Sequence, residues 1–219
     1  MKLFLDSADV TIIEQYKNTY LIDGITTNPT SLSKEQKKPH AIITSITELL
    51  PLGDISVEVT EQLPDKMYKQ AREIAHLAPN ICVKIPCHQD YYSIIKQLVS
   101  EGIALNVTLV FSLFQALAMA KLGVRYISVF VGRWDAIGTN GAQQIYDIML
   151  MLQKYQFTSQ LLVASVRTPR HVHEAIMAGA HAITLPPSLF ATLITHPLTN
   201  QGIEIFMQDW QASSHQTFP

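Results

Sequence analysis

The sequence has only two cysteines, no long apolar run and no excess of basic charge. Its 219 residues carry 16 Lys and Arg against 18 Asp and Glu, a formal net charge of -2, so no positive field exists to hold a nucleic acid or an anionic membrane. Cys82 and Cys87 share one apolar stretch without spaced histidines, which favours buried reduced thiols over a disulfide framework or a zinc site. We therefore expect no nucleic-acid partner and no metal.

The N-terminus also lacks the features of an export signal. The opening residues MKLFLDSAD reach the acidic Asp6 after a short apolar stretch, and no segment approaches the roughly 20 apolar residues of a membrane span. With reduced cysteines, this predicts a cytoplasmic protein that does not enter a membrane.

Eight short apolar runs alternate with longer segments of helical period. The runs cover 2–6, 22–27, 55–60, 81–86, 103–110, 126–132, 160–166 and 182–187. They are apolar at successive positions, as expected of parallel strands covered on both faces. The intervening stretches are long enough for crossover helices, which are clearest at 90–102, 112–123 and 168–180. The pattern predicts the α/β class, with one (β/α)8 TIM-barrel domain over residues 1–219.

An extra helix is predicted beyond the eighth run, at 199–212. Ile203, Phe206 and Trp210 lie three and four residues apart and form one apolar stripe. The stripe can pack on its own barrel or dock on a neighbouring subunit, and periodicity leaves both alternatives open.

Polar residues gather near the ends of the predicted strands. In a barrel these ends form the face that carries the active site. The candidates are Asp6, Thr26, Asn28, Glu58, Lys84, Asn106, Thr108, Ser128, Arg133, Ser165 and Arg167.

Lys84 is the most informative of these candidates, because it interrupts the apolar strand ICVKIP. Desolvation disfavours an ammonium ion and favours the neutral amine, which can attack a carbonyl and form an imine. The alternative is a structural lysine that reaches the rim of the barrel or pairs with Glu58. Asp6 and Glu58 could supply the acid and base of an imine mechanism, although each could equally be a structural acceptor.

Two arginines and a serine follow the sixth and seventh runs. Arg133, Ser165 and Arg167 predict a phosphate site, since the guanidinium donors match phosphate oxygens. The alternative is an ion pair between an arginine and Asp135.

His171 and His173 lie two residues apart at the start of a predicted helix, which argues against a metal pair. We interpret them as surface residues.

Six segments in the same order resemble the transaldolase family, over nearly the whole chain. They are FLDSAD (4–9), GITTNPT (24–30), VKIP (83–86), LNVT (105–108), VGR (131–133) and ASVRTP (164–169). The length is similar to that of the short subfamily that includes fructose-6-phosphate aldolases. The resemblance implies a class I mechanism without a cofactor, sugar phosphates as substrates, and a homo-oligomer, commonly a decamer joined through the C-terminal helix.

The resemblance also implies a role for each candidate residue. Lys84 would form the Schiff base, Asp6 would move the proton of the hydroxyl at the cleaved bond, and Glu58 and Thr108 would position a water. The residues expected to bind substrate are Thr26, Asn28, Asn106, Ser128, Phe130, Arg133, Ser165 and Arg167.

Four positions separate the two activities of the family. Glu58, Ser128, Phe130 and Arg167 are similar to transaldolase, whereas the aldolase branch typically has glutamine, alanine, tyrosine and lysine there. We therefore expect transfer of a dihydroxyacetone unit from fructose 6-phosphate or sedoheptulose 7-phosphate to an aldose phosphate, in the pentose phosphate pathway.

Three alternatives remain open. They are fructose-6-phosphate aldolase, a silent barrel that senses sugar phosphates, and another lysine-dependent barrel such as deoxyribose-phosphate aldolase. Val129 and Trp134 depart from the family pattern and could reshape the sugar pocket.

Overall fold

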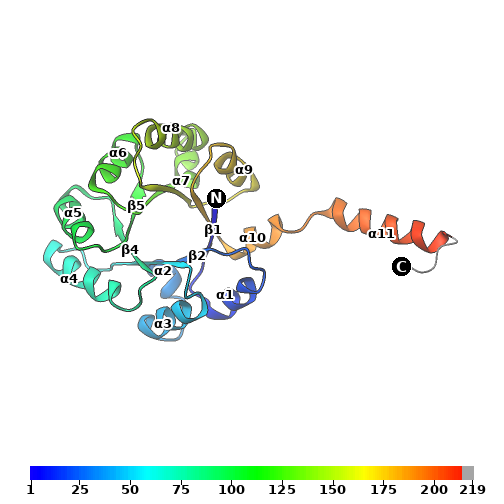
Figure 1. Cartoon of the computed structure of the whole chain (residues 1–219), viewed down its shortest axis with the longest axis horizontal. Helices are drawn as coiled ribbons and strands as arrows, with labels where there is room; N and C mark the ends of the chain where they lie inside the picture. The colour runs from blue at the N-terminus through cyan, green and yellow to red at the C-terminus, as the bar shows by residue number, and fades with distance from the viewer. Residues whose placement is uncertain (214–219) are drawn as a thin grey trace.

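Eight parallel strands close into a barrel in the computed structural model, which describes residues 1–213 (Figure 1). They are β1 Lys2–Asp6, β2 Gly24–Thr26, β3 Asp54–Glu58, β4 Ile81–Pro86, β5 Leu105–Val110, β6 Tyr126–Phe130, β7 Gln160–Ala164 and β8 Ala182–Leu185. β8 pairs with β1, so the sheet has no free edge. The predicted TIM barrel is confirmed, and each predicted run overlaps one strand, with β3 beginning one residue before its run.

Helices surround the barrel, and the last helix of the described chain extends away from it (Figure 1). They are α1 Val10–Lys17, α2 Pro29–Leu32, α3 Pro39–Leu49, α4 Pro64–Ala75, α5 Tyr92–Ser100, α6 Leu113–Leu122, α7 Val131–Ala136, α8 Gly141–Lys154, α9 Pro169–Met177, α10 Pro187–Leu193 and α11 Pro197–Ala212, with a 3-10 turn at Gln89–Tyr91. Side-chain caps fix several starts: the Ser112 hydroxyl accepts from the Gln115 backbone N–H at α6. Gly123 ends the same helix with φ +85, in the left-handed region that favours glycine.

Five predicted strands are too long at their C-terminal ends, and for two of them the structure shows where the chain leaves the sheet. The run 126–132 stops being a strand at Phe130, because Val131 begins α7 and Gly132 donates its N–H to the Ser165 carbonyl. The run 160–166 ends at Ala164, because Ser165 has φ +58 and turns the chain. Arg133 therefore lies on a helix rather than on a strand.

The hydrophobic core has an outer and an inner part. The outer part lies between the strands and the helices and includes Ile25, Val83 and Ile127, all fully buried. The inner part fills the barrel with Phe4, Cys82, Tyr126, Leu162, Ala164 and Ala182. Side chains alternate between these two parts along each strand, which explains the continuously apolar runs.

Gly24 shows how tightly the inner part is packed. A Cβ there would lie 2.3 Å from the Asp54 carbonyl oxygen and 3.0 Å from the Phe4 ring, so only glycine lets β2 approach its neighbours.

Both cysteines are free thiols, as expected. Cys82 is buried and Cys87 is half-buried, so the expectation of two buried thiols holds fully only for Cys82. Burial raises the pKa of each thiol above its ordinary value.

Within residues 1–213, no helix combines the length and apolar character needed to cross a membrane.

The extra C-terminal helix is confirmed as α11, and it extends away from the barrel (Figure 1). None of its described residues is buried, and Ile203 and Phe206 are 57% and 74% exposed. The alternative in which the stripe packs on its own barrel is therefore wrong. The last residues of the predicted domain, 214–219, lie outside the described part of the chain.

Candidate active site

A cavity of about 370 Å³ lies at the C-terminal ends of the barrel strands. Its lining contains Asp6, Thr26, Asn28, Pro29, Thr30, Glu58, Lys84, Leu109, Ser128, Phe130, Arg133, Leu162, Ala164, Ser165 and Thr184. Nine of the twelve candidate residues therefore share one cavity. The other three, Asn106, Thr108 and Arg167, are outside its lining.

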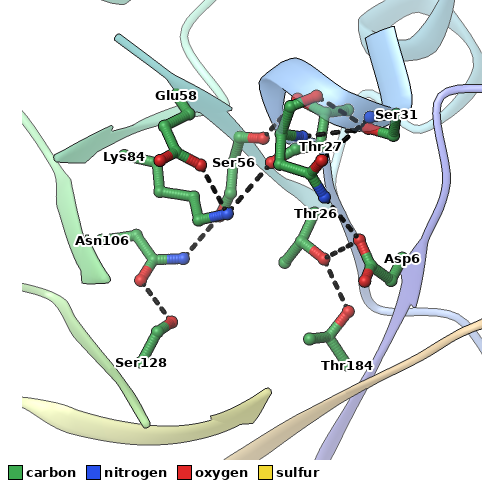
Figure 2. Close-up of polar contacts among 11 residues, drawn as sticks. Asp6, Thr26, Thr27, Ser31, Ser56, Glu58, Lys84, Asn106, Ser128 and Thr184 are labelled. Carbon is green, nitrogen blue, oxygen red and sulfur yellow. Dashed lines mark hydrogen bonds and ion pairs between the residues drawn. The ribbon is translucent and has the colours of Figure 1, made fainter. Parts of the chain in front are cut away.

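Lys84 points into this cavity from β4 and is only 7% exposed (Figure 2). Its Nζ lies 2.9 Å from a carboxylate oxygen of Glu58, which is its register partner on β3, and donates to the Thr27 carbonyl at 3.2 Å. The predicted pairing with Glu58 thus exists, and it lies inside the cavity rather than at an outer rim. At this distance the carboxylate is placed to accept a proton from the lysine.

Asp6, at the end of β1, is held by hydroxyl and amide donors (Figure 2). Its Oδ1 accepts from the Thr26 hydroxyl at 3.3 Å and from the Asn28 side-chain amide at 3.4 Å. The Thr26 hydroxyl also lies 2.6 Å from that of Thr184. Burial raises the pKa of Asp6 above its ordinary value, and Glu58 adds to this, while Lys84 and the Thr26 hydrogen bond act in the opposite direction.

Asn106 is fully buried between two serines (Figure 2). Its Nδ2 donates to the Ser56 hydroxyl at 3.0 Å, and its Oδ1 accepts from Ser128 at 2.6 Å. These two bonds fix which end of the amide faces which neighbour. Lys84 and Asn106 are register partners on β4 and β5, so the amide lies beside the amine.

Thr108 follows two residues along β5 and is 1% exposed. Its hydroxyl is the one buried side-chain polar atom of the described chain that has no hydrogen-bond partner. The pairing of β5 with β6 is irregular between Val107 and Val110, where Leu109 adopts φ +58. Such a bulge redirects side chains, and Leu109 lines the cavity.

The predicted phosphate-binding residues come from two segments. The Arg133 guanidinium, on α7, lies 4.8 Å from the centre of the Phe130 ring, a stacking distance. Ser165 lines the cavity from the turn after β7, while Arg167 is exposed next to it. The two segments touch, because a Cβ at Gly132 would lie 2.8 Å from Cδ of Arg167.

The interpretation of His171 as a surface residue is wrong, whereas His173 is exposed as expected. His171 is 5% exposed and contacts Asp135, so Asp135 pairs with this histidine and not with an arginine. The sequence held a signal for this burial: His171 lies four residues before Ala175, which is fully buried on the same face of α9.

Six lining residues were not among the candidates: Pro29, Thr30, Leu109, Leu162, Ala164 and Thr184. Thr184 lies two residues after Ala182, which faces the barrel interior, so the alternation of the strand could have found it. Leu162 and Ala164 carry no polar atoms in their side chains and gave no signal.

The arrangement combines a buried amine, two carboxylates and a cation at the mouth of one cavity. An amine beside a carboxylate can condense with a carbonyl group, and a second carboxylate with a raised pKa can hold a proton. This chemistry suits a carbonyl compound with an anionic end.

Known proteins are similar to this chain over nearly its whole length. Residues 3–217 match the family described as Transaldolase/Fructose-6-phosphate aldolase. The chain belongs to this family. A protein named "Probable transaldolase" from Lactiplantibacillus plantarum is 44% identical over 212 residues, 97% of each chain. "Probable transaldolase 2" from Listeria monocytogenes is 43% identical over 216 residues, 99% of each chain, and a "Probable transaldolase" from Caulobacter sp. is 42% identical over 96% of each chain.

The two departures from the transaldolase family pattern lie away from the cavity. Val129 is fully buried in the outer core, and Trp134 is 2% exposed and donates its indole N–H to the Phe111 carbonyl. Neither residue lines the cavity. Glu58, Ser128 and Phe130, three of the four positions expected to separate the family's two activities, do line it.

Proposed function

We propose that this protein is a transaldolase that carries a dihydroxyacetone unit on Lys84. The donor is a ketose phosphate, fructose 6-phosphate or sedoheptulose 7-phosphate, and the acceptor is an aldose phosphate, as in the pentose phosphate pathway. The observation that supports the proposal most directly is the buried Lys84 amine, 2.9 Å from the Glu58 carboxylate inside a polar cavity.

Glu58 makes the amine reactive. It accepts the ammonium proton, and the neutral amine attacks the ketose carbonyl carbon to give a carbinolamine. Glu58 returns the proton to the carbinolamine hydroxyl, which leaves as water, and the nitrogen lone pair forms the C=N bond of a protonated imine. Thr108, whose buried hydroxyl has no partner within the described chain, supplies a hydrogen bond to this water.

Asp6 moves the proton during cleavage. The carboxylate takes the proton of the hydroxyl next to the bond that breaks; the bond's electron pair shifts to the imine, giving an enamine on Lys84 and a free aldose phosphate. The acceptor aldehyde then draws the enamine's electrons into a new carbon–carbon bond, and Asp6 returns the proton to the new hydroxyl. Its raised pKa fits a carboxylate that holds a proton between steps.

The remaining residues of the site bind the sugar. Asn28 and Ser128 bind the end that stays on the lysine, Asn106 holds Ser128 in place from outside the cavity lining, and Thr26 holds Asp6. Arg133, Ser165 and Arg167 take the phosphate, Arg133 from its stacked position on Phe130. A phosphate bound at the mouth leaves the carbonyl end directed toward Lys84.

Phe130 favours transfer over release of free dihydroxyacetone. A tyrosine hydroxyl at this position could help to protonate the enamine, whereas the phenylalanine ring offers no proton. The enamine therefore persists until an aldehyde captures it. Fructose-6-phosphate aldolase activity is the second candidate, because the family contains both reactions.

Borohydride trapping tests the Schiff base. Incubation with fructose 6-phosphate and borohydride should add the reduced sugar fragment to one peptide, at Lys84, as read by mass spectrometry. Lys84→Met should remove the label, while Lys96→Met, at an exposed lysine of α5, should keep it. An unlabelled parent protein would indicate a barrel that only binds sugar phosphates.

A coupled assay separates the two activities. Without an acceptor, fructose 6-phosphate should be consumed slowly and little free dihydroxyacetone should appear; an aldose phosphate acceptor should accelerate consumption. Release of dihydroxyacetone as fast as the ketose is consumed, without an acceptor, would identify an aldolase instead.

A further inference from the structure

The buried imidazole of His171 connects two segments of the chain. The Arg167 backbone N–H donates to Nδ1 at 3.1 Å, and Nε2 lies 2.9 Å from Oδ2 of Asp135. Because Nδ1 accepts a hydrogen bond, the ring proton is on Nε2, which donates to the carboxylate. Both ring nitrogens are thereby used, one toward the turn after β7 and the other toward α7.

Asp135 is itself fixed. Its second oxygen, Oδ1, accepts from the Gly141 backbone N–H at 3.0 Å, so the carboxylate lies between α8 and the histidine. Slight burial raises the pKa of Asp135, but the bonds from Gly141 and His171 outweigh it and hold the pKa below the ordinary value. The acceptor for His171 is therefore charged near neutral pH.

A second connection joins the same two segments. Gly132 donates its N–H to the Ser165 carbonyl at 3.1 Å, and a Cβ on Gly132 would lie only 2.4 Å from that oxygen. Ser165 has φ +58, a conformation that a serine keeps only when its surroundings impose it. The turn after β7 is thus held against α7 at two points, by Gly132 and by His171.

Each of these segments carries one part of the proposed phosphate site. Arg133 lies on α7, two residues from Asp135, and Ser165 and Arg167 lie on the turn. We propose that His171 is a positioning residue that sets the geometry between these two parts, and so determines preference for phosphorylated over unphosphorylated sugars. This inference rests on the proposed phosphate site.

Substitution of His171 tests the inference through substrate preference. With saturating ketose donor, kcat/KM is measured for glyceraldehyde 3-phosphate and for unphosphorylated glyceraldehyde. His171→Leu should lower the ratio of the two values by about tenfold, mainly through a higher KM for the phosphorylated acceptor, because misplaced donors weaken binding of the phosphate. The kcat with glyceraldehyde should stay within about twofold of the parent value.

Three variants complete the series. His171→Asn keeps an acceptor for the Arg167 N–H and should restore part of the preference. Asp135→Asn changes the carboxylate that His171 contacts. The Asp135 side chain is 44% exposed, so this variant should still fold. It should lower the ratio of the two kcat/KM values, as His171→Leu does. His173→Leu, at an exposed histidine of the same helix, should leave the ratio unchanged.

Binding of inorganic phosphate separates this inference from the proposed function. Thermal stabilisation by phosphate should require about tenfold more phosphate in His171→Leu than in the parent, whether or not the protein transfers a dihydroxyacetone unit. An inactive parent with this difference would reject the transaldolase proposal and keep the role of His171. Equal losses with both acceptors, or unchanged phosphate binding in the folded His171 and Asp135 variants, would overturn that role.

Discussion

Asp54→Asn should destabilise the protein without changing its chemistry. Asp54 begins β3, at the end of the barrel opposite to the cavity, and is 8% exposed. It accepts from the Tyr126 hydroxyl at 2.6 Å and pairs with Lys2 at 2.9 Å and Arg125 at 2.7 Å. The amide keeps the volume but removes the charge and places an NH2 group against donors.

The size of the effect follows from the exposure of each partner. The Lys2 and Arg125 side chains are 36% and 44% exposed, and their charges can turn to water, so the two pairs together contribute only about 1 kcal/mol. The buried Tyr126 hydroxyl loses a bond to a charged acceptor, which costs about 1.5–3 kcal/mol. The total is about 2–4 kcal/mol, which for a chain of this length lowers Tm by roughly 5–15 °C.

Thermal unfolding and steady-state kinetics together check this prediction. Tyr126→Phe removes only the hydroxyl and should cost less; the double variant should cost less than the sum of the two single variants, because they share one bond. Transfer activity per folded molecule should remain within about twofold. An unchanged Tm, or lost activity at an unchanged Tm, would refute the assignment of this cluster to stability.

Three further predictions concern the site and the C-terminal helix. The raised pKa of Asp6 means that the folded protein favours the protonated carboxyl over the carboxylate. The protonated carboxyl therefore contributes fully to the free energy of unfolding below the unfolded pKa, about 4, and this contribution is lost as the pH rises through the folded pKa. Asp6→Asn should therefore raise Tm near pH 7, by an amount that vanishes near pH 4, while abolishing transfer; a lower Tm at pH 7 would contradict this. Phe130→Tyr should increase release of free dihydroxyacetone relative to transfer in the coupled assay, whereas Phe111→Tyr, at a ring that contacts Phe130 but does not line the cavity, should not. We propose that α11 docks on another copy of the chain. Phe206→Asp should then lower the oligomer mass measured by light scattering, and Gln208→Asp should not. Equal masses of the parent and the Phe206→Asp variant would reject this docking.

The barrel could be predicted because its strands are covered on both faces. Residues such as Ile25, Val83 and Ile127 face the helices, and Phe4 and Cys82 face the interior, so each strand appears as one apolar run. Lys84 was visible as a break in such a run. Strand ends were less predictable, since Val131 is as apolar as a strand residue yet begins a helix.

Contacts between distant segments could not be predicted from local patterns. The burial of His171 depends on a carboxylate 36 residues earlier in the chain and on a backbone N–H in a turn. The direction of α11 could not be predicted either, because an apolar stripe at helical spacing is compatible with packing on its own barrel or on another copy of the chain. Periodicity shows that a face is apolar but not which surface covers it.

The interior of the barrel has an apolar layer and a polar layer nearer the strand ends, and this explains why the lysine of the proposed Schiff base is at position 84. Inward side chains recur every second residue, so β3 places Asp54, Ser56 and then Glu58 inside, and β4 places Cys82 and then Lys84. Cys82 does not line the cavity, and the inner core around it is mostly apolar, so an amine at this level would not reach the cavity. One step nearer the strand ends, the amine of Lys84 reaches both the Glu58 carboxylate and the cavity.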